Sequence, residues 1–344
     1  MFAEPQHRPT VPLSFTYSAS IPKLLEALKI SLLISAYQAG KLIVLRAKAG
    51  ELTAIVRHSD RVMGIAVTPE KLAVGTRSAI SVWENSSLTG SESERCQAWF
   101  VPHPPIVTGD LGVREVAWGE ETLWLTSTRF SALFSLTLRD NSCPIINTNA
   151  LLQCDWQPPF LMSFEAEDRC HLNGIAMVNG QPQYVTVLAA TDAVEGWRKD
   201  KINGGCAIDV TSGEIVARGF SMPHSPRVYD NRLWLLDSGR GRLVIVDAAT
   251  GQHDVVAEFP GFARGLAFCD RYAFVGLSKI RDSTTFRGLP IERHPQTLEC
   301  AVWVVKIDSG KVLGSIKFQS HCNELFDVQI LENISHPTLL YSKL

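Results

Sequence analysis

Short apolar runs separated by glycine-containing turns recur along the whole chain. Residues 32–51 (LLISAYQAGKLIVLRAKAGE) and 234–252 (WLLDSGRGRLVIVDAATGQ) align without a gap, and glycines match at two positions. Each stretch has the pattern of a strand, a tight loop, a second strand, a turn and the start of a third strand. Turns of Asp, Ser or Thr, and Gly also follow apolar runs at 209–213 and 306–310, and they suit hairpins with a positive φ at the last turn residue. The pattern predicts a repeated antiparallel β unit.

A second repeated element is a short apolar strand that begins with small or polar residues. It occurs at Met63–Val67, Arg114–Trp118, Asn173–Met177, Pro226–Tyr229, Arg264–Phe268 and Phe326–Ile330. Six copies at intervals of roughly 40 to 60 residues match the four-stranded blades of a β-propeller. Glycine and alanine suit the innermost strand of a blade, where the strands crowd around the central axis.

The two ends of the chain supply the strands of the remaining blade. At most one strand follows the last inner strand, whereas three, at about 31–37, 41–47 and 52–57, precede the first. We predict an all-β, six-bladed β-propeller whose N-terminal strands complete the last blade, which removes an open sheet edge. A β-sandwich, or two stacked β-domains, is the alternative fold.

One domain is expected, with residues 1–29 as an N-terminal arm and residues 30–344 as the propeller. The pattern at 20–29 predicts one short amphipathic helix outside the ring. The sequence assigns no role to 335–344, although 338–341 could form an extra strand.

Composition restricts the partners and the location. The net charge is -2 and no basic run occurs, so we expect no nucleic-acid partner. The most apolar stretch, 30–45, is interrupted by polar residues, and we expect no membrane association. The N-terminus lacks the pattern of a secretion signal, and the eight cysteines include no C-x-x-C pair. We therefore expect a cytoplasmic protein without a zinc finger.

Propeller geometry predicts where a site would lie. Inner strands all begin on one face, and the loops that join second to third strands return to that face. Two such loops, 191–204 and 279–298, are long enough to be lids or binding loops. The residues at the heads of the inner strands are unusually polar, and we expect them to surround one channel mouth: Arg61, Gly112, His171, His224, Phe262 and Glu324, then Arg114, Asn173 and Arg264, then Glu115, Arg227 and Asp327.

Histidines in equivalent positions of adjacent blades suggest two kinds of chemistry. His171 and His224, with Glu324, could hold one divalent metal ion on the propeller axis. Alternatively, the two histidines and Glu115 could act as catalytic acid and base groups. The third interpretation is structural, with each histidine bonded to a neighbouring backbone or carboxylate.

Arginines around the same mouth suggest an anionic ligand. Candidate substrate-binding residues are Arg61, Arg114, Asn173, Arg227 and Arg264. The four arginines are candidates because guanidinium groups bind carboxylates and phosphates with two hydrogen bonds. An equally strong alternative is internal ion pairing with Glu115, Glu324 and Asp327. Trp197 lies in a long loop, where we expect an exposed aromatic ring that contacts the ligand.

Several segments resemble a known bacterial family. TGDLGVREVAWG, DRCHLNGIA, GFSMPHSPRVYDNRLWLLDSGRG and PGFARGLAFCDRYAFVGLSKIRDS resemble conserved hypothetical proteins that carry a domain of unknown function. Members often occur beside tetratricopeptide-repeat proteins. The resemblance runs from about Ser31 to Ile330 and implies no particular reaction. The family pattern usually has a histidine at the position of Arg114, which with His171 and His224 would make three. The loss of that histidine weakens the metal hypothesis for this chain.

A more distant similarity is to six-bladed propellers of the gluconolactonase and strictosidine-synthase type. Lactonases of that kind hold an axial divalent cation through carboxylate and asparagine ligands, which Glu115, Asn173, Glu324 and Asp327 could imitate. Shared architecture does not by itself transfer a reaction.

Two functions follow from the sequence. The first is a ligand-binding enzyme whose pocket takes a small molecule or peptide, with a metal-assisted hydrolase, lyase or tailoring oxidase as the candidate classes. The second is a non-catalytic platform for a protein or peptide partner. Apolar residues of the second long loop, Phe286, Leu289, Pro290 and Ile291, favour the platform if they are exposed.

Overall fold

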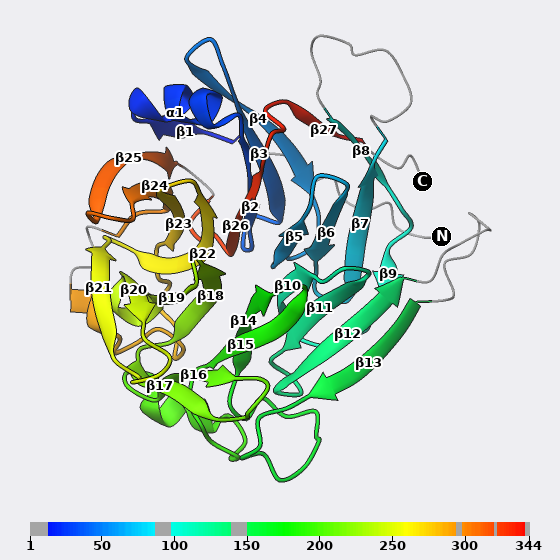
Figure 1. Cartoon of the computed structure of the whole chain (residues 1–344), viewed down its shortest axis with the longest axis vertical. Coiled ribbons are helices and arrows are strands. Elements are labelled where there is room, and N and C mark those ends of the chain that lie inside the picture. Colours follow the sequence, from blue (N-terminus) through cyan, green and yellow to red (C-terminus); the bar gives the residue numbers. More distant parts are fainter. Residues whose placement is uncertain (1–12, 87–97, 139–149, 294–297, 320–321, 341–344) are drawn as a thin grey trace, which may run out of the picture.

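Six β-sheets are arranged around a central axis in the computed structural model of the chain (Figure 1). The structure describes residues 13–86, 98–138, 150–293, 298–319 and 322–340. Blade 1 combines strands from the N-terminal and C-terminal parts of the chain, and blades 2 to 6 follow in chain order. The six-bladed, all-β prediction is confirmed.

Blade 1 contains one strand from the C-terminal part of the chain and three from the N-terminal part. Its inner strand β26 (Asp327–Leu331) pairs antiparallel with β2 (Ser31–Ala36), and β3 (Lys41–Lys48) and β4 (Glu51–His58) follow outward. In the register, Ser31 lies opposite Leu331 and Ser35 opposite Asp327. The prediction that N-terminal strands complete the last blade is therefore confirmed.

The other five blades each follow one stretch of the chain, from the inner to the outer strand. Blade 2 contains β5 (Ile65–Val67), β6 (Lys71–Gly75), β7 (Ala79–Asn85) and β8 (Ala98–Pro102), and β9 (Ile106–Val107) also pairs with β7; blade 3 contains β10 (Val113–Trp118), β11 (Thr122–Ser127), β12 (Ala132–Leu138) and β13 (Ala150–Trp156). Blade 4 contains β14 (Leu172–Val178), β15 (Gln181–Val187), β16 (Gly205–Asp209) and β17 (Ile215–Phe220); blade 5 contains β18 (Pro223–Tyr229), β19 (Arg232–Asp237), β20 (Arg242–Val246) and β21 (His253–Glu258). Blade 6 contains β22 (Phe262–Cys269), β23 (Tyr272–Ser278), β24 (Ala301–Lys306) and β25 (Lys311–Phe318).

Terminal segments cover two outer edges of the ring. The predicted helix is α1 (Ser20–Leu28), which buries Ile21 and Leu25 in the core beside β3 and β25. Strand β1 (Phe15–Tyr17) pairs with β25, the outer strand of blade 6, and lies beside α1 at the outer edge of the ring (Figure 1). In the C-terminal segment, β27 (Pro337–Leu339) pairs in parallel with β8. Residue 341 of the suggested extra strand lies outside the described residues. These pairings cover outer strands that would otherwise offer free hydrogen-bonding edges.

The inner strands alternate between two kinds of residue at one equivalent position. Blades 2, 4 and 6 have Gly64, Gly174 and Gly265 there, whereas blades 3, 5 and 1 have Glu115, Arg227 and Asp327. A Cβ atom on each glycine would overlap the inner strand of the next blade: the Arg114 carbonyl, the Pro226 ring and the backbone of Asp327 and Val328, respectively. The glycines therefore let neighbouring inner strands approach closely, and the three long charged side chains extend into the channel between them.

Short 3₁₀ turns occur in the connections, at η2 (Gly196–Asp200), η3 (Ser238–Arg240) and η4 (Pro290–Arg293). Among the residues that the structure describes, no helix has the length and apolar character needed to cross a bilayer.

Candidate functional site at the channel mouth

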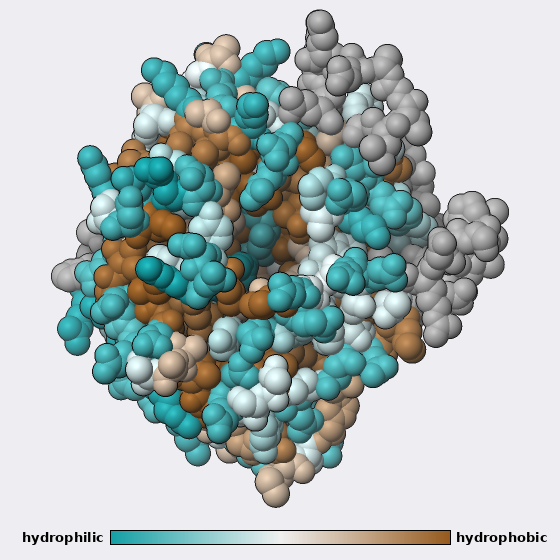
Figure 2. Space-filling view, in the orientation of Figure 1, coloured by the Kyte–Doolittle hydropathy of each residue, from teal (hydrophilic) through white to brown (hydrophobic). Residues whose placement is uncertain are grey.

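Strand register places the long loops and the heads of the inner strands at one face. Leu172, at the start of β14, lies opposite Val187, at the end of β15, so the loop 188–204 leaves the sheet beside His171. Phe262 likewise lies opposite Ser278, where the loop 279–300 begins. The channel opens as a hollow at the centre of the ring, with hydrophilic side chains in its depth (Figure 2). We call the face with these loops the mouth face.

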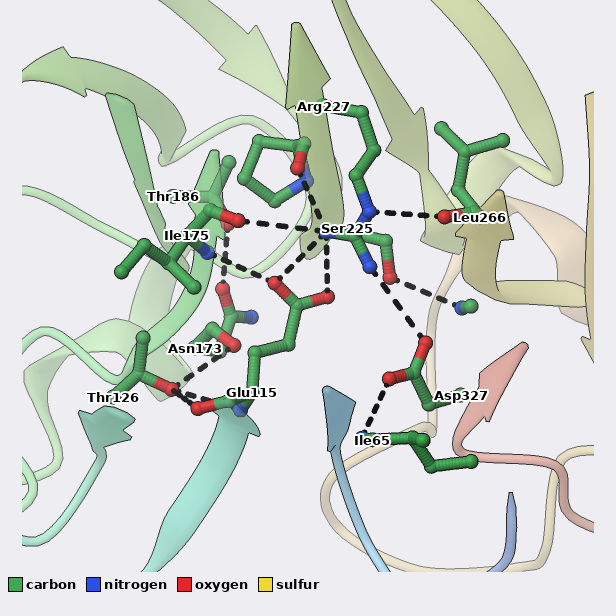
Figure 3. Close-up of polar contacts among 12 residues, drawn as sticks. Ile65, Glu115, Thr126, Asn173, Ile175, Thr186, Ser225, Arg227, Leu266 and Asp327 are labelled. Atoms are coloured by element: carbon green, nitrogen blue, oxygen red, sulfur yellow. Dashed lines mark hydrogen bonds and ion pairs between the residues drawn. The ribbon is translucent and has the colours of Figure 1, made fainter. Parts of the chain in front are cut away.

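Deep in the channel, three charged side chains from alternate blades form an ion-pair network (Figure 3). Arg227 Nη1 lies 3.2 Å from Glu115 Oε2, and Arg227 Nη2 lies 3.7 Å from Asp327 Oδ1. Both carboxylates are almost fully buried. We refer to Glu115, Arg227 and Asp327 as the central network.

Each member of the central network also bonds to the backbone of the next blade. Glu115 accepts a hydrogen bond from the Ile175 amide, Asp327 accepts one from the Ile65 amide, and Arg227 donates one to the Leu266 carbonyl, at 2.9, 2.8 and 2.9 Å. The three partners directly follow the three inner-strand glycines. Each of these hydrogen bonds joins two neighbouring blades, so the network links the blades at the centre of the ring.

Electrostatics agree with this structural role. Burial raises the pKa of Asp327 to about 7. The negative charge of Glu115 also raises this pKa, whereas the positive charge of Arg227 lowers it. For Arg227, burial acts to lower the pKa, but the charges of Glu115 and Asp327 outweigh it and raise the pKa overall. Arg227 is thus the cation that compensates two buried carboxylates. Of the two interpretations of this arginine, internal ion pairing fits the structure.

Asn173 belongs to the same layer of structural contacts. Its Nδ2 donates to the Pro223 carbonyl at 2.9 Å, and its Oδ1 accepts from Thr186 Oγ1 at 2.7 Å. Asn173, Glu115 and Arg227 were candidates for catalysis and substrate binding, yet their polar atoms are already bonded within the protein.

Nearer the mouth, His171 is held between a carboxylate and an aromatic ring. Its Nδ1 lies 2.8 Å from Asp168 Oδ2, and its ring centroid lies 4.7 Å from that of Trp197. Burial lowers the pKa of His171, while Asp168 opposes this shift. Asp168 was missed by the sequence analysis, although it lies three residues before His171 in the segment DRCH.

His224 lies beside a cation. Its Nδ1 lies 2.8 Å from the Met222 carbonyl oxygen, and its Nε2 lies 3.3 Å from Arg264 Nη2. Burial, followed by the charge of Arg264, holds the pKa of His224 well below its usual range. The imidazole is therefore neutral and accepts a hydrogen bond from the guanidinium.

Arg114 and Arg264 are half-buried, and no salt bridge joins either guanidinium group to a carboxylate of the described residues; we call them the arginine pair. Their guanidinium carbons lie 6.0 and 4.8 Å from the ring centroid of Phe326, and the Nε of each is buried with no hydrogen-bond partner among the residues that the structure describes. Arg114 Nη1 lies 3.8 Å from the sulfur of Met63. Burial, and then the charge of Arg114, lower the pKa of Arg264 to about 10. Burial likewise lowers the pKa of Arg114.

The predicted metal ligands are not arranged around one ion. Glu324 Oε1 lies 3.2 Å from Arg281 Nε, as an ion pair rather than an aligned hydrogen bond. His224 Nε2 faces the cationic Arg264, which disfavours a metal ion there. Across the described ranges, no group of three or more His, Cys, Asp or Glu side chains could hold a metal ion. The set His171, His224 and Glu324 does not fit a metal centre, and we derive no step through one.

Two expectations about exposure were wrong. Trp197 is 1% exposed rather than open to a ligand, and it packs with Leu188, Met222 and Phe262. Phe286 and Leu289 of the other long loop are buried in the same cluster. Sequence reasoning could not see this contact, because it joins two loops that are far apart in the chain.

The two long loops also meet through hydrogen bonds. Arg198 Nη1 donates to Thr285 Oγ1 at 3.3 Å, and Lys201 Nζ donates to the Thr284 carbonyl at 2.7 Å. The loops of blades 4 and 6 therefore contact each other next to the start of the inner strand of blade 5. Together they cover one side of the mouth. Arg61, in contrast, is exposed, and no described contact links it to the arginine pair.

An open groove lies away from the channel mouth. A groove of about 790 Å³ is lined by residues such as Tyr184, Arg232 and His253, which the strand directions place at the opposite face, between blades 4 and 5. It contains no concentration of buried, unpaired polar groups comparable to the arginine pair. We therefore place the candidate site at the channel mouth, because the arginine pair lies there, and not in the groove, whose volume alone would favour it.

The fold and these contacts define a six-bladed β-propeller with a cationic, aromatic-lined channel mouth. Residues 19–340 match the family model described as "Domain of unknown function (DUF4915)", and the chain belongs to that family. A search of curated proteins found no match.

Solved structures show likeness in fold. A chain from the crystal structure of a nidogen/laminin complex is 14% identical, with a TM-score of 0.58 over 88% of this chain and 99% of that one. The computationally designed Ika8 protein is 12% identical, with a TM-score of 0.41 over 86% of each chain. The nidogen/laminin likeness supports the propeller architecture alone.

Proposed function

We propose that this propeller binds an anionic small molecule or peptide at the channel mouth, with a carboxylate between Arg114 and Arg264. The observation that carries the proposal is the half-buried arginine pair, whose Nε atoms are buried without an acceptor among the described residues. Two like charges that act on each other, each with a buried Nε–H group that lacks an acceptor, are costly, and a bound carboxylate would supply the missing charge and acceptors.

The surroundings favour a ligand with an apolar or aromatic part next to its carboxylate. Phe326 lies beneath both guanidinium groups, and Phe262 lies 5.3 Å from the Arg264 guanidinium carbon. The ring of Tyr37 lies near that of Phe326, with ring centroids 6.0 Å apart and a tilt of 38° between the planes. Aromatic rings beside arginines offer a flat apolar surface at which the charged end of a ligand can be paired.

A matched pair of probes tests the proposal. Benzoate carries a carboxylate on an aromatic ring, and benzamide is its neutral analogue of nearly the same shape. We expect benzoate, but not benzamide, to bind in an NMR titration. The variants Arg114→Gln and Arg264→Gln should each weaken benzoate binding about tenfold or more, because a charge-assisted hydrogen bond contributes about 1.5–3 kcal/mol.

Arg242→Gln is the control variant. Arg242 is an arginine of blade 5 that pairs at the surface with Glu258. It should leave benzoate affinity unchanged. Equal binding of benzoate and benzamide, or equal benzoate affinity in the wild type and both arginine-pair variants, would refute the proposal.

A protein-binding platform is the second candidate. Met162, Phe164 and Val194 are 85%, 48% and 59% exposed, and all three lie in loops at the mouth face. Exposed apolar side chains beside a binding pocket are typical of contact with a peptide or protein. Replacing Met162 and Val194 with serine should abolish partner binding in that case and leave benzoate affinity intact. Reduced benzoate affinity in that variant would argue against a separate platform.

A further inference from the structure

The Asp168–His171 pair has the geometry of a proton-accepting site. The 2.8 Å contact with Asp168 places the imidazole proton on Nδ1, because a carboxylate only accepts hydrogen bonds. The lone pair is then on Nε2. Hydrogen bonding of one ring nitrogen to a carboxylate is the usual way in which proteins set the tautomer of a basic histidine.

The backbone holds this histidine in an uncommon conformation. His171 has φ of 56°, in the left-handed region that non-glycine residues seldom adopt. Trp197 packs on the ring, and the loop that carries Trp197 is itself bonded to the loop of blade 6. The imidazole is therefore fixed on two sides, by Asp168 and by Trp197.

His171 also lies within electrostatic reach of the arginine pair. The charges of Arg114 and Arg264 both act on its pKa, in the direction that keeps the ring neutral. His224, on the other side of the mouth, has Nε2 occupied by Arg264 and Nδ1 near the Met222 carbonyl. Of the two histidines, His171 is therefore the one whose Nε2 has no hydrogen-bond partner within the described residues.

We infer that His171 is a general base for a carboxylate ligand that is held by Arg114 and Arg264 and carries an acidic O–H or C–H group. This inference rests on the proposed function. In the step, Nε2 accepts the proton, the electron pair stays on the ligand oxygen or carbon, and the imidazolium is stabilised by Asp168 through the Nδ1 proton. Asp168 acts through His171 and is a positioning residue.

Bromoacetate tests this arrangement without knowledge of the natural ligand. Its carboxylate would occupy the arginine pair, and its methylene carbon would meet Nε2. The nitrogen lone pair forms a C–N bond, the C–Br bond breaks, and bromide leaves. Neutral bromoacetamide undergoes the same reaction but lacks the charge, and the ratio of the rates at two histidines cancels the difference in intrinsic reactivity between the reagents.

Peptide mass spectrometry measures the rate at each histidine. Exposed His253 is the internal reference. Fragment spectra separate alkylated His171 from Cys170, a buried thiol whose pKa is raised to about 12 by burial. We expect bromoacetate to alkylate His171 about tenfold or more faster than His253, because bound reactants gain from proximity. Bromoacetamide should show no such preference.

Three variants separate the roles. Arg264→Gln should remove the preference for bromoacetate, and Asp168→Asn should slow alkylation of His171 while benzoate still binds. Glu167→Gln, next to Asp168 in the chain, should change neither. Glu167 bonds to Arg169 rather than to His171.

The outcomes distinguish the two proposals. If benzoate binds through the arginine pair but His171 reacts no faster than His253, the general-base inference is overturned and the proposed function stands. Equal acceleration by bromoacetamide would also overturn it, since the reaction would not depend on the anion. If benzoate does not bind and no selective alkylation occurs, the proposed function itself fails.

Discussion

Replacing Arg227 with methionine should destabilise the propeller strongly, because two buried carboxylates would lose their shared cation. Glu115 and Asp327 are 5% and 1% exposed, and Arg227 lies between them. Removing one member of a buried ionic network typically costs about 3–5 kcal/mol. With about 2.1 cal/mol/K per residue for the entropy of unfolding, a chain of 344 residues should lose about 4–7 °C in Tm.

The loss should depend on pH. An acid with a higher pKa in the folded than in the unfolded state binds a proton more readily when folded, so folding becomes less favourable as pH rises through that range. Asp327 titrates in the folded protein at about 7, against about 3.9 when unfolded. Removing Arg227 raises its pKa further. The deficit should be greatest above pH 7 and should shrink as pH falls, because a proton then replaces the lost cation.

Thermal unfolding followed by circular dichroism, near pH 8 and near pH 5.5, measures both effects. Arg242→Met is the matched control, since its pair with Glu258 is at the surface and is worth well under about 1 kcal/mol. A Tm of Arg227→Met within about 1 °C of the control near pH 8 would refute the structural role of the central network, and a deficit that is no smaller near pH 5.5 would contradict the part assigned to Asp327.

The remaining predictions concern the glycines and the second histidine. Gly265→Ala should cost about 3 kcal/mol or more, because φ is +85° and the new Cβ would overlap the inner strand of blade 1, whereas Gly288→Ala, at φ +86° in open space, should cost only about 1–2 kcal/mol; equal urea midpoints would contradict the packing argument. Arg264→Met should raise the pKa of His224, because a neighbouring cation that disfavours the imidazolium is removed. An NMR pH titration in which the His224 pKa does not move would show that burial alone sets it.

The fold was predictable because each blade repeats the same local pattern. Inner strands, hairpin turns and the closure of blade 1 all follow from hydrophobic periodicity and from turn residues, which are local in sequence. The central network was also visible in principle. The alternation of Gly64, Gly174 and Gly265 with Glu115, Arg227 and Asp327 at one position indicates three pairs of blades, but the sequence analysis left ligand binding and internal ion pairing as equal alternatives for the charged residues.

The site was only partly predictable, because it depends on contacts between distant segments. Four arginines were equivalent candidates from sequence. Which of them is paired depends on which carboxylate its long side chain reaches across the channel, and only Arg227 reaches two. Trp197 was expected to be exposed, because nothing local shows that the loop of blade 6 packs beside it. Asp168 was missed because Asp-x-x-His is too short a pattern to identify a hydrogen-bonded pair.

The side-chain Nε–Hε NMR signals of arginine test the central claim most directly. On addition of benzoate, the account predicts that the signals of Arg114 and Arg264, assigned from their glutamine variants, shift as new hydrogen bonds form. The signals of Arg227 and Arg242 should stay in place. If benzoate leaves the signals of the arginine pair unmoved, or shifts the surface Arg242 signal equally, the channel mouth is not the anion site that we propose.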